Sequence, residues 1–167
     1  MEDFNLSENF TFYELTKTSH KQFLEENRKV SVQEVEKLTS LAGLLETVRE
    51  IVDKPIIVHS GRRCKPLNDL IGSTDRSQHL KCEAADFSIL GMSNNEAFAK
   101  IQTGALNSKI RFGQLIHERT KRPYGVNDWL HISLGYPFVL KEKSGQVLTM
   151  RNGLYEMVRT INRDAVA

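Results

Sequence analysis

Two short segments of the chain concentrate side chains that can bind a metal ion or move a proton. They cover residues 77–86 and 127–131. Among their side chains are two imidazoles and two carboxylates, those of His79, His131, Asp86 and Asp128. Two imidazoles and one carboxylate form a ligand set typical of catalytic zinc, which keeps a fourth position open for water. These segments are therefore candidates for a catalytic zinc site.

Side-chain alternation in the predicted strands brings the candidate ligands together. If residues 84–89 form a strand, Asp86 lies on its polar face, because its immediate neighbours point into the core. In a second strand over 129–134, His131 can face Asp86 across the sheet. His79 precedes the first strand, on a loop that can bring a third ligand to the same place.

Asp128 is the candidate general base of this site. In a regular strand it would lie on the face opposite to His131, because side chains alternate along a strand. If residues 125–128 form a turn instead, Asp128 can lean over the metal site and take a proton from the nucleophilic water. The role of Asp128 therefore depends on a turn at 125–128.

The spacing of these residues leaves a second interpretation open. Surface loops often hold histidines and aspartates that bind no metal. On spacing alone, a plain α+β domain without a metal remains an alternative.

Three helices are predicted from capping boxes and apolar spacing. Ser31 and Glu34 form a capping box, and apolar residues then recur at helical spacing over 32–52. A short helix opens at Thr11, and another begins at Ser93 and is expected to stop at Gly104.

The predicted strands lie at 56–59, 84–89, 112–117, 129–134 and, more weakly, 147–150. Two long polar connections, 61–81 and 118–128, lie between strands, and such connections usually carry function. Helices and strands do not alternate regularly along the chain. We therefore expect one α+β domain over residues 1–167, with helices on one face of a mainly antiparallel sheet.

Length and composition limit the classes of function. Of the 167 residues, 40% are hydrophobic, which is enough for a packed core, and the net charge of +2 argues against a nucleic-acid partner. No run of roughly 18 apolar residues indicates a membrane span, and the acidic start does not look like an export signal. Two cysteines are too few for a disulfide scaffold. We expect a soluble protein that its core stabilises.

Four motifs follow one another along the chain. They are Ser60-Gly61-Arg62-Arg63, Pro66-Leu67-Asn68, Ser77-x-His79-x-x-Cys82-x-Ala84-x-Asp86 and Asp128-Trp129-x-His131. This series resembles that of the zinc D-alanyl-D-alanine carboxypeptidase family, which includes phage L-alanyl-D-glutamate endolysins. The metal signature of that family is Ser-x-His-x-x-Gly-x-Ala-x-Asp followed by Trp-x-His. Segments at 9–15, 48–50 and 114–118 also resemble the phage-associated branch, so the resemblance covers about residues 9–134.

The resemblance implies a fold like that of the D,D-peptidases and hedgehog domains, and it implies a role for each matching residue. The zinc ligands would be His79, Asp86 and His131, and Asp128 would be the catalytic base. Arg63 matches an arginine that would bind a substrate carboxylate or stabilise the developing oxyanion.

Three further residues could support the ligands. Glu118 matches a family glutamate, and it could bond to a zinc-ligating histidine or form a structural salt bridge. Ser77 and Trp129 belong to the metal motifs and are candidates for the same supporting role.

Two positions depart from the family pattern. Arg62 stands where the family usually has tyrosine, which is expected to alter the pocket without removing the metal. Cys82 stands where the family usually has glycine, and if that position has a positive φ, the cysteine is strained by about 1 kcal/mol or more. Its thiolate could occupy the open metal position, but we favour a buried unpaired thiol. A disulfide with Cys64 depends on a Cα separation that the sequence does not show.

Together these features predict a zinc-dependent peptidase that hydrolyses an amide bond in peptidoglycan stem peptides. We expect a monomeric phage endolysin of the L-alanyl-D-glutamate endopeptidase type, which is made in the host cytoplasm and reaches the cell wall at lysis. The alternatives are a D-alanyl-D-alanine carboxypeptidase and a non-catalytic, zinc-stabilised binding or virion-structural domain. Arg62 and Cys82 are the features that favour the non-catalytic alternative.

Overall fold

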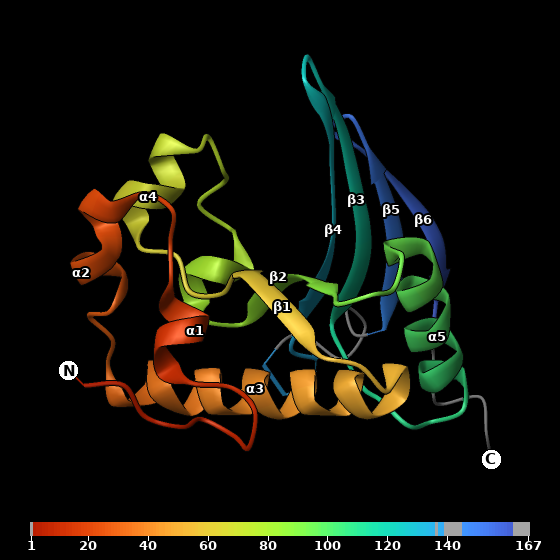
Figure 1. Cartoon of the computed structure of the whole chain (residues 1–167), viewed down its shortest axis with the longest axis horizontal. Coiled ribbons are helices and arrows are strands. Elements are labelled where there is room, and N and C mark those ends of the chain that lie inside the picture. The colour runs from red at the N-terminus through yellow and green to blue at the C-terminus, as the bar shows by residue number, and fades with distance from the viewer. Residues whose placement is uncertain (1, 136, 139–144, 162–167) are drawn as a thin grey trace.

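A mainly antiparallel sheet organises the chain in the computed structural model, which describes residues 2–135, 137–138 and 145–161. The strands within these residues are β1 (Ile56–Ser60), β2 (Ala84–Ile89), β3 (Gln114–Arg122), β4 (Gly125–Ser133), β5 (Gln146–Arg151) and β6 (Leu154–Thr160). They pair in the order β1-β2-β4-β3-β5-β6, and β3 and β5 are the parallel pair (Figure 1). The predicted α+β class is confirmed.

Helices pack against this sheet, three of the described ones before β1 in the chain and two between later strands. The helices of the described residues are α1 (Phe12–Thr16), α2 (Leu24–Asn27), α3 (Val32–Val52), α4 (Lys65–Leu70) and α5 (Asn94–Leu106), with short 3-10 turns η1 (Lys21–Phe23) and η2 (Gln78–Lys81). None of these described helices has the length and apolar character needed to cross a membrane. The polar connection predicted at 61–81 contains α4 and η2.

Helix α3 covers the residues that the apolar spacing predicts. Its capping box is present, because Ser31 Oγ accepts from the Glu34 N–H and Glu34 Oε2 accepts from the Ser31 N–H. Its buried leucines join Phe87 of β2 and Leu130 of β4 in the hydrophobic core. This packing assigns one face of the sheet to the core and leaves the opposite face for polar groups.

Helix α5 begins where predicted but ends at Leu106 instead of Gly104. Gly104 lies inside the helix, where a Cβ atom would be only 2.7 Å from Ile51 Cδ1 of α3. The glycine therefore serves the close approach of two helices and does not end one, which corrects the prediction.

The polar stretch 118–128 forms most of a β-hairpin, although the sequence predicts a long connection. Strands β3 and β4 are joined by a turn at 123–124, so the turn at 125–128 on which the role of Asp128 depended does not form. The hairpin projects beyond the rest of the sheet at the top of Figure 1, and Tyr124 at its tip is fully exposed. Because solvent surrounds this tip, its residues lack the alternation of apolar and polar side chains that identifies a half-buried strand.

Strand β5 confirms the weak prediction at 147–150, whereas β6 was not predicted. All the residues of β6 are exposed, so no buried face imposes an apolar period on its sequence.

Cys82 ends η2 in the left-handed backbone region, with φ 60° and ψ 29°. Its side chain is completely buried, and its Sγ atom lies 3.8 Å from Glu34 Oε1. Both Cys82 and Cys64 are free thiols, which confirms the favoured alternative of an unpaired cysteine. A family glycine at this position is explained by its positive φ, which costs a residue with a Cβ atom about 1 kcal/mol.

Because Cys82 has a positive φ, we expect glycine to be a more stable replacement than alanine at this position, the reverse of the usual order. Cys82→Gly and Cys82→Ala remove the same sulfur, but only glycine adopts φ 60° without strain. We expect Cys82→Gly to be more stable than Cys82→Ala by about 0.5–1 kcal/mol in urea unfolding. A Cys82→Gly protein less stable than Cys82→Ala would contradict the account.

Candidate metal centre and active site

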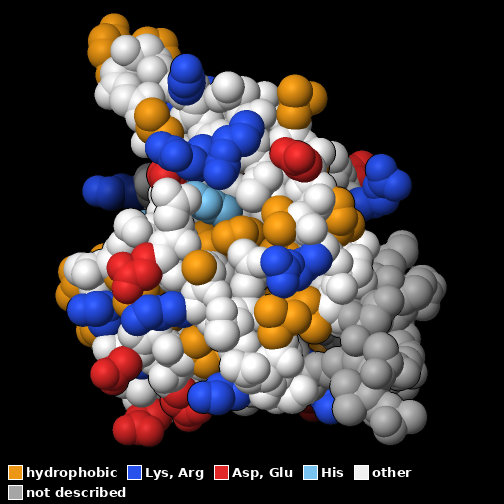
Figure 2. Space-filling view, turned by 90° about the vertical axis from the view of Figure 1, so that its right-hand side faces the viewer, with side chains coloured by type: hydrophobic (Ala, Val, Ile, Leu, Met, Phe, Trp, Pro, Cys, Tyr) orange, Lys and Arg blue, Asp and Glu red, His pale blue; other side chains and the backbone are white. Residues whose placement is uncertain are grey.

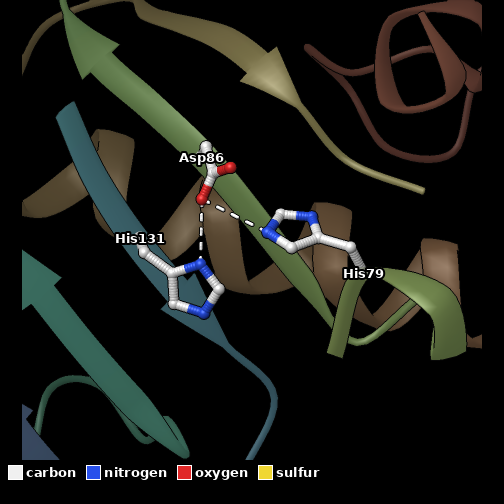
Figure 3. Close-up of side chains that lie close together, drawn as sticks. All are labelled: His79, Asp86 and His131. Atoms are coloured by element: carbon white, nitrogen blue, oxygen red, sulfur yellow. Dashed lines mark hydrogen bonds and ion pairs between the residues drawn. The ribbon is translucent and has the colours of Figure 1, made fainter. Parts of the chain in front are cut away.

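The antiparallel register of β2 and β4 places Asp86 directly opposite His131. Asp86 Oδ1 lies 2.8 Å from His131 Nδ1 and 3.3 Å from His79 Nε2. Figure 3 shows the three side chains converging, with Asp86 from β2, His131 from β4 and His79 from η2. Their ligand atoms all lie within 4.8 Å of one another, so one metal ion can contact all three. The structure thus brings the three predicted ligands together.

The second nitrogen of each imidazole meets a carbonyl oxygen. His79 Nδ1 lies 2.7 Å from the Gly61 carbonyl oxygen, and His131 Nε2 lies 3.2 Å from Gln78 Oε1. A carbonyl oxygen can only accept a hydrogen bond, so when each ring is neutral the proton stays on that nitrogen and the other nitrogen offers its lone pair to a metal. Those free nitrogens are His79 Nε2 and His131 Nδ1, the two beside Asp86. Metal-binding histidines commonly have such a partner, so the residues fit a zinc ion.

Gln78 is a functional candidate that the sequence prediction missed. Its Nε2 donates to Ser133 Oγ over 3.0 Å, which orients its Oε1 toward His131. The only signal in the sequence was its position next to His79 within the metal motif.

The buried carboxyl of Asp86 is held in its charged form. Burial alone would raise the pKa of Asp86, but the charges and hydrogen bonds of His79 and His131 outweigh burial and hold it far below its usual range. Arg63 Nη2 lies 3.6 Å from Asp86 Oδ2 and 3.4 Å from Ser60 Oγ. Arg63 therefore lies at the predicted site, next to the carboxylate oxygen that is turned away from the imidazoles.

Glu118 of β3 lies on the same face of the sheet as the three ligands. It is paired with Trp129 of β4, one alternation along the strand from His131. Burial raises the pKa of Glu118, Asp86 adds to this effect, and His131 and Arg63 oppose it. Glu118 is therefore a carboxylate close enough to the cluster to feel its charges.

Asp128 lies on the opposite face of the sheet. Strand β4 is regular through this residue, which pairs with Arg119. Asp128 Oδ1 accepts from Asn94 over 2.8 Å and lies 2.8 Å from His117 Nε2, and Oδ2 lies 2.9 Å from Arg119 Nε. Asp128 is therefore not part of the metal-ligand group, although it lines the cleft that Asp86 also borders.

The surroundings of Asp128 belong to the side of the molecule that carries α5. Figure 2 shows this side, with Lys and Arg side chains gathered above a narrow strip of histidine surface. Burial raises the pKa of Asp128, but bonds from Asn94 and His117 outweigh it and lower the pKa overall. Through these contacts, Asp128 links β4 to β3 and to the start of α5.

A cleft of about 460 Å³ opens beside the cluster. Its lining residues are His59, Asp86, Val126, Asn127, Asp128 and Trp129. Trp129 thus borders the candidate site, as its place in the motif suggests. Ser77 only precedes η2, and its side chain does not cap that helix.

The two departures from the family pattern both point away from the cluster. Arg62 donates to the carbonyl oxygens of Glu26 and Lys29 over 2.8 Å each, so it anchors the chain between α2 and α3. Cys82 is absent from the metal-ligand group, and burial, with the charge of Glu34, raises the pKa of its thiol to about 12.

A family model described as Peptidase M15 matches residues 8–133. The match includes every residue of the cluster, whereas β5 and β6 lie beyond its end. A comparison with curated proteins finds no match.

Metal content tests the cluster directly. Protein purified without chelator should contain about one zinc per chain by elemental analysis, because the three donors form an open catalytic ligand set. His131→Ala should lose most of this zinc, whereas Asp128→Asn should retain it, since Asp128 lies on the other face. His20→Ala is the matched control for loss of an imidazole elsewhere. Full zinc content in His131→Ala would show that the metal binds at another place.

Proposed function

The chain belongs to the Peptidase M15 family, and on this premise we propose that it is a zinc-dependent peptidase acting on the stem peptides of peptidoglycan. The observation that carries the proposal is the Asp86 carboxylate, shared by His79 and His131 beside an open cleft. The tautomers favoured by Gly61 and Gln78 support a metal on this side of both rings.

Zinc at this site would polarise the scissile carbonyl and lower the pKa of a water molecule. The remaining chemistry falls to side chains of this chain. Arg63 keeps Asp86 oriented through the oxygen that does not face the imidazoles, and its positive charge favours the negative charge that develops on the substrate carbonyl.

Glu118 is our candidate for the general base. It would take a proton from the attacking water and pass it to the nitrogen of the leaving amine. Its support is its place on the ligand face of the sheet and a pKa raised by burial, since a base with a higher pKa accepts a proton more readily. Asp128, which the family resemblance suggests for this role, has a lowered pKa and three bonding partners on the other face.

For the bond cleaved, we propose the amide between L-alanine and D-glutamate, in an enzyme of the phage endolysin type. The support is the resemblance of segments 9–15 and 114–118 to the phage-associated branch. An enzyme that dissolves crosslinked wall must cut within the chain, whereas trimming free D-alanine ends leaves crosslinks intact.

Matched isosteric substitutions separate the two candidate bases. Glu118→Gln should keep its zinc and lose about 10²–10⁴-fold in turnover, the usual contribution of a general base. Asp128→Asn should keep both zinc and most of its turnover, with a lower stability in urea unfolding because the contact with Arg119 loses its charge. Turnover and zinc content are measured on the same preparations. The assignment fails if Asp128→Asn loses the larger share of turnover with its zinc intact.

Mass spectrometry of digested peptidoglycan tests the bond. Stem peptides that begin at D-glutamate are the expected product. Release of free D-alanine alone would identify a carboxypeptidase instead. If zinc-loaded protein releases neither product, the peptidase proposal itself is contradicted.

A further inference from the structure

The sheet divides beside the metal cluster. Strand β2 pairs with β4 only as far as Phe87 and Leu130, whereas its last two residues, Ser88 and Ile89, stay paired with β1. The β3–β4 hairpin continues beyond this point and rises away from β1 and β2 (Figure 1). Within the described part of the chain, residues 125–129 of β4 therefore have no strand partner on the side that β2 has left. These residues form the free edge of β4.

The backbone groups of Val126 point toward the free edge. Val126 is opposite Lys121 in the β3–β4 pair, and two residues further along, Asp128 is opposite Arg119. The Lys121 N–H and the Arg119 carbonyl oxygen both bond to Asn152, which follows β5, so they point away from β4. In antiparallel strands, the partners of such residues point the opposite way, away from β3. The N–H and carbonyl groups of Val126 and Asp128 thus face outward.

Most of these outward groups are open. The carbonyl oxygen of Asp128 accepts from Asn94 Nδ2 over 3.0 Å, which confirms its direction. The N–H and carbonyl oxygen of Val126 have no hydrogen-bond partner among the described residues, and Val126 is half-exposed. A strand edge with open donors and acceptors can add an extended peptide as a further strand.

The free edge lines the same cleft as the metal cluster. Residues 126–129 of β4 form one part of the lining, and His59 of β1 and Asp86 of β2 form the rest. With a volume of about 460 Å³, the cleft is within the usual range for small-ligand sites. Because Asp86 belongs to both the cleft and the metal cluster, a peptide paired with the free edge lies beside the metal position.

The charges of the cleft suit an uncharged peptide main chain. Two carboxylates line it, those of Asp86 and Asp128. Asp86 already has a cationic partner in Arg63, 3.6 Å away. Asp128 has one in Arg119, at 2.9 Å. A further anion beside these carboxylates would be repelled, whereas the N–H and carbonyl groups of a peptide carry no net charge.

We propose that the free edge of β4 binds the main chain of the substrate as an added strand, in which one substrate residue exchanges two hydrogen bonds with Val126. The proposal rests on the proposed function, because it takes the bound peptide to be the one cut at the cluster. One residue directly opposite Val126 is enough to satisfy both of its backbone groups. The free edge then recognises an extended main chain, and the choice of the bond to be cut is left to the groups around the metal.

Hydrogen exchange in the parent protein tests this pairing without a substitution. The ligand is a stem tripeptide of acetyl-L-alanine, D-glutamate and L-lysine, in which CH₂ replaces the N–H of the first peptide bond. Zinc-loaded protein can bind this ligand but cannot cut it. Saturation should slow the exchange of the Val126 amide by about 10-fold or more, because this amide then donates to the ligand. The Asn127 amide points toward β3 and is the matched control, which should change little.

Two substitutions test the same hydrogen bond by affinity. Val126→Pro removes the donor that faces the cleft and no bond to β3, whereas Val126→Thr keeps the N–H and the β-branched shape. Trp129 is the single tryptophan of the chain and lines the cleft, so its fluorescence reports binding of the ligand. Val126→Pro should bind about 10-fold more weakly than the parent, and Val126→Thr within about 2-fold of it, both with the zinc content of the parent.

An unchanged exchange rate of the Val126 amide in saturated protein would overturn the proposal. Equal binding by the two variants would do the same, and so would a zinc-loaded parent that does not bind the ligand. If Val126→Pro does not fold, the exchange result decides alone. Cleavage of the natural tripeptide is measured in parallel: if the pairing is found but the tripeptide is not cut, the free edge stands as a peptide-binding site and the proposed cleavage is wrong.

Discussion

The pairing of Asp86 on β2 with His131 on β4 is the contact on which the candidate site depends. It joins a buried carboxylate to an imidazole over 2.8 Å, and His79 then completes the group from η2. The register that makes this pair is maintained by the core face of the same strands, where Phe87 and Leu130 are opposed and fully buried. A slip of one residue would turn Leu130 toward the site and His131 into the core. The hydrophobic core therefore determines the geometry of the polar face.

The alternation of side chains along β3 and β4 also places two further carboxylates, Glu118 and Asp128, on opposite faces of the sheet. Glu118 is on the ligand face, where the charges of Asp86 and His131 act on it. Asp128 is on the core side with α5, where it bonds to His117 and Arg119. One face of the β3–β4 hairpin thus contributes to the candidate chemistry and the other to the attachment of a helix.

Elements with a local signal could be predicted from the sequence. Helix α3 has its capping box and apolar period, and β2 lies within a motif whose alternation also predicted that Asp86 and His131 would meet. The side on which Asp128 lies could not be predicted, because it depends on where the hairpin turns, and the exposed polar stretch carries no period. The contribution of Gln78 was hidden for a different reason, since it acts through one side-chain bond to His131 that only the fold reveals.

The position of the metal is the most direct test of this account. A crystal of the zinc-loaded protein, measured at the zinc absorption edge, should show an anomalous peak about 2.0–2.2 Å from His79 Nε2, Asp86 Oδ1 and His131 Nδ1. Glu118 should lie on the metal side of the sheet, with Asp128 still bonded to His117. A peak bound by Asp128 or Cys82, or no peak between the two imidazoles, would contradict the account.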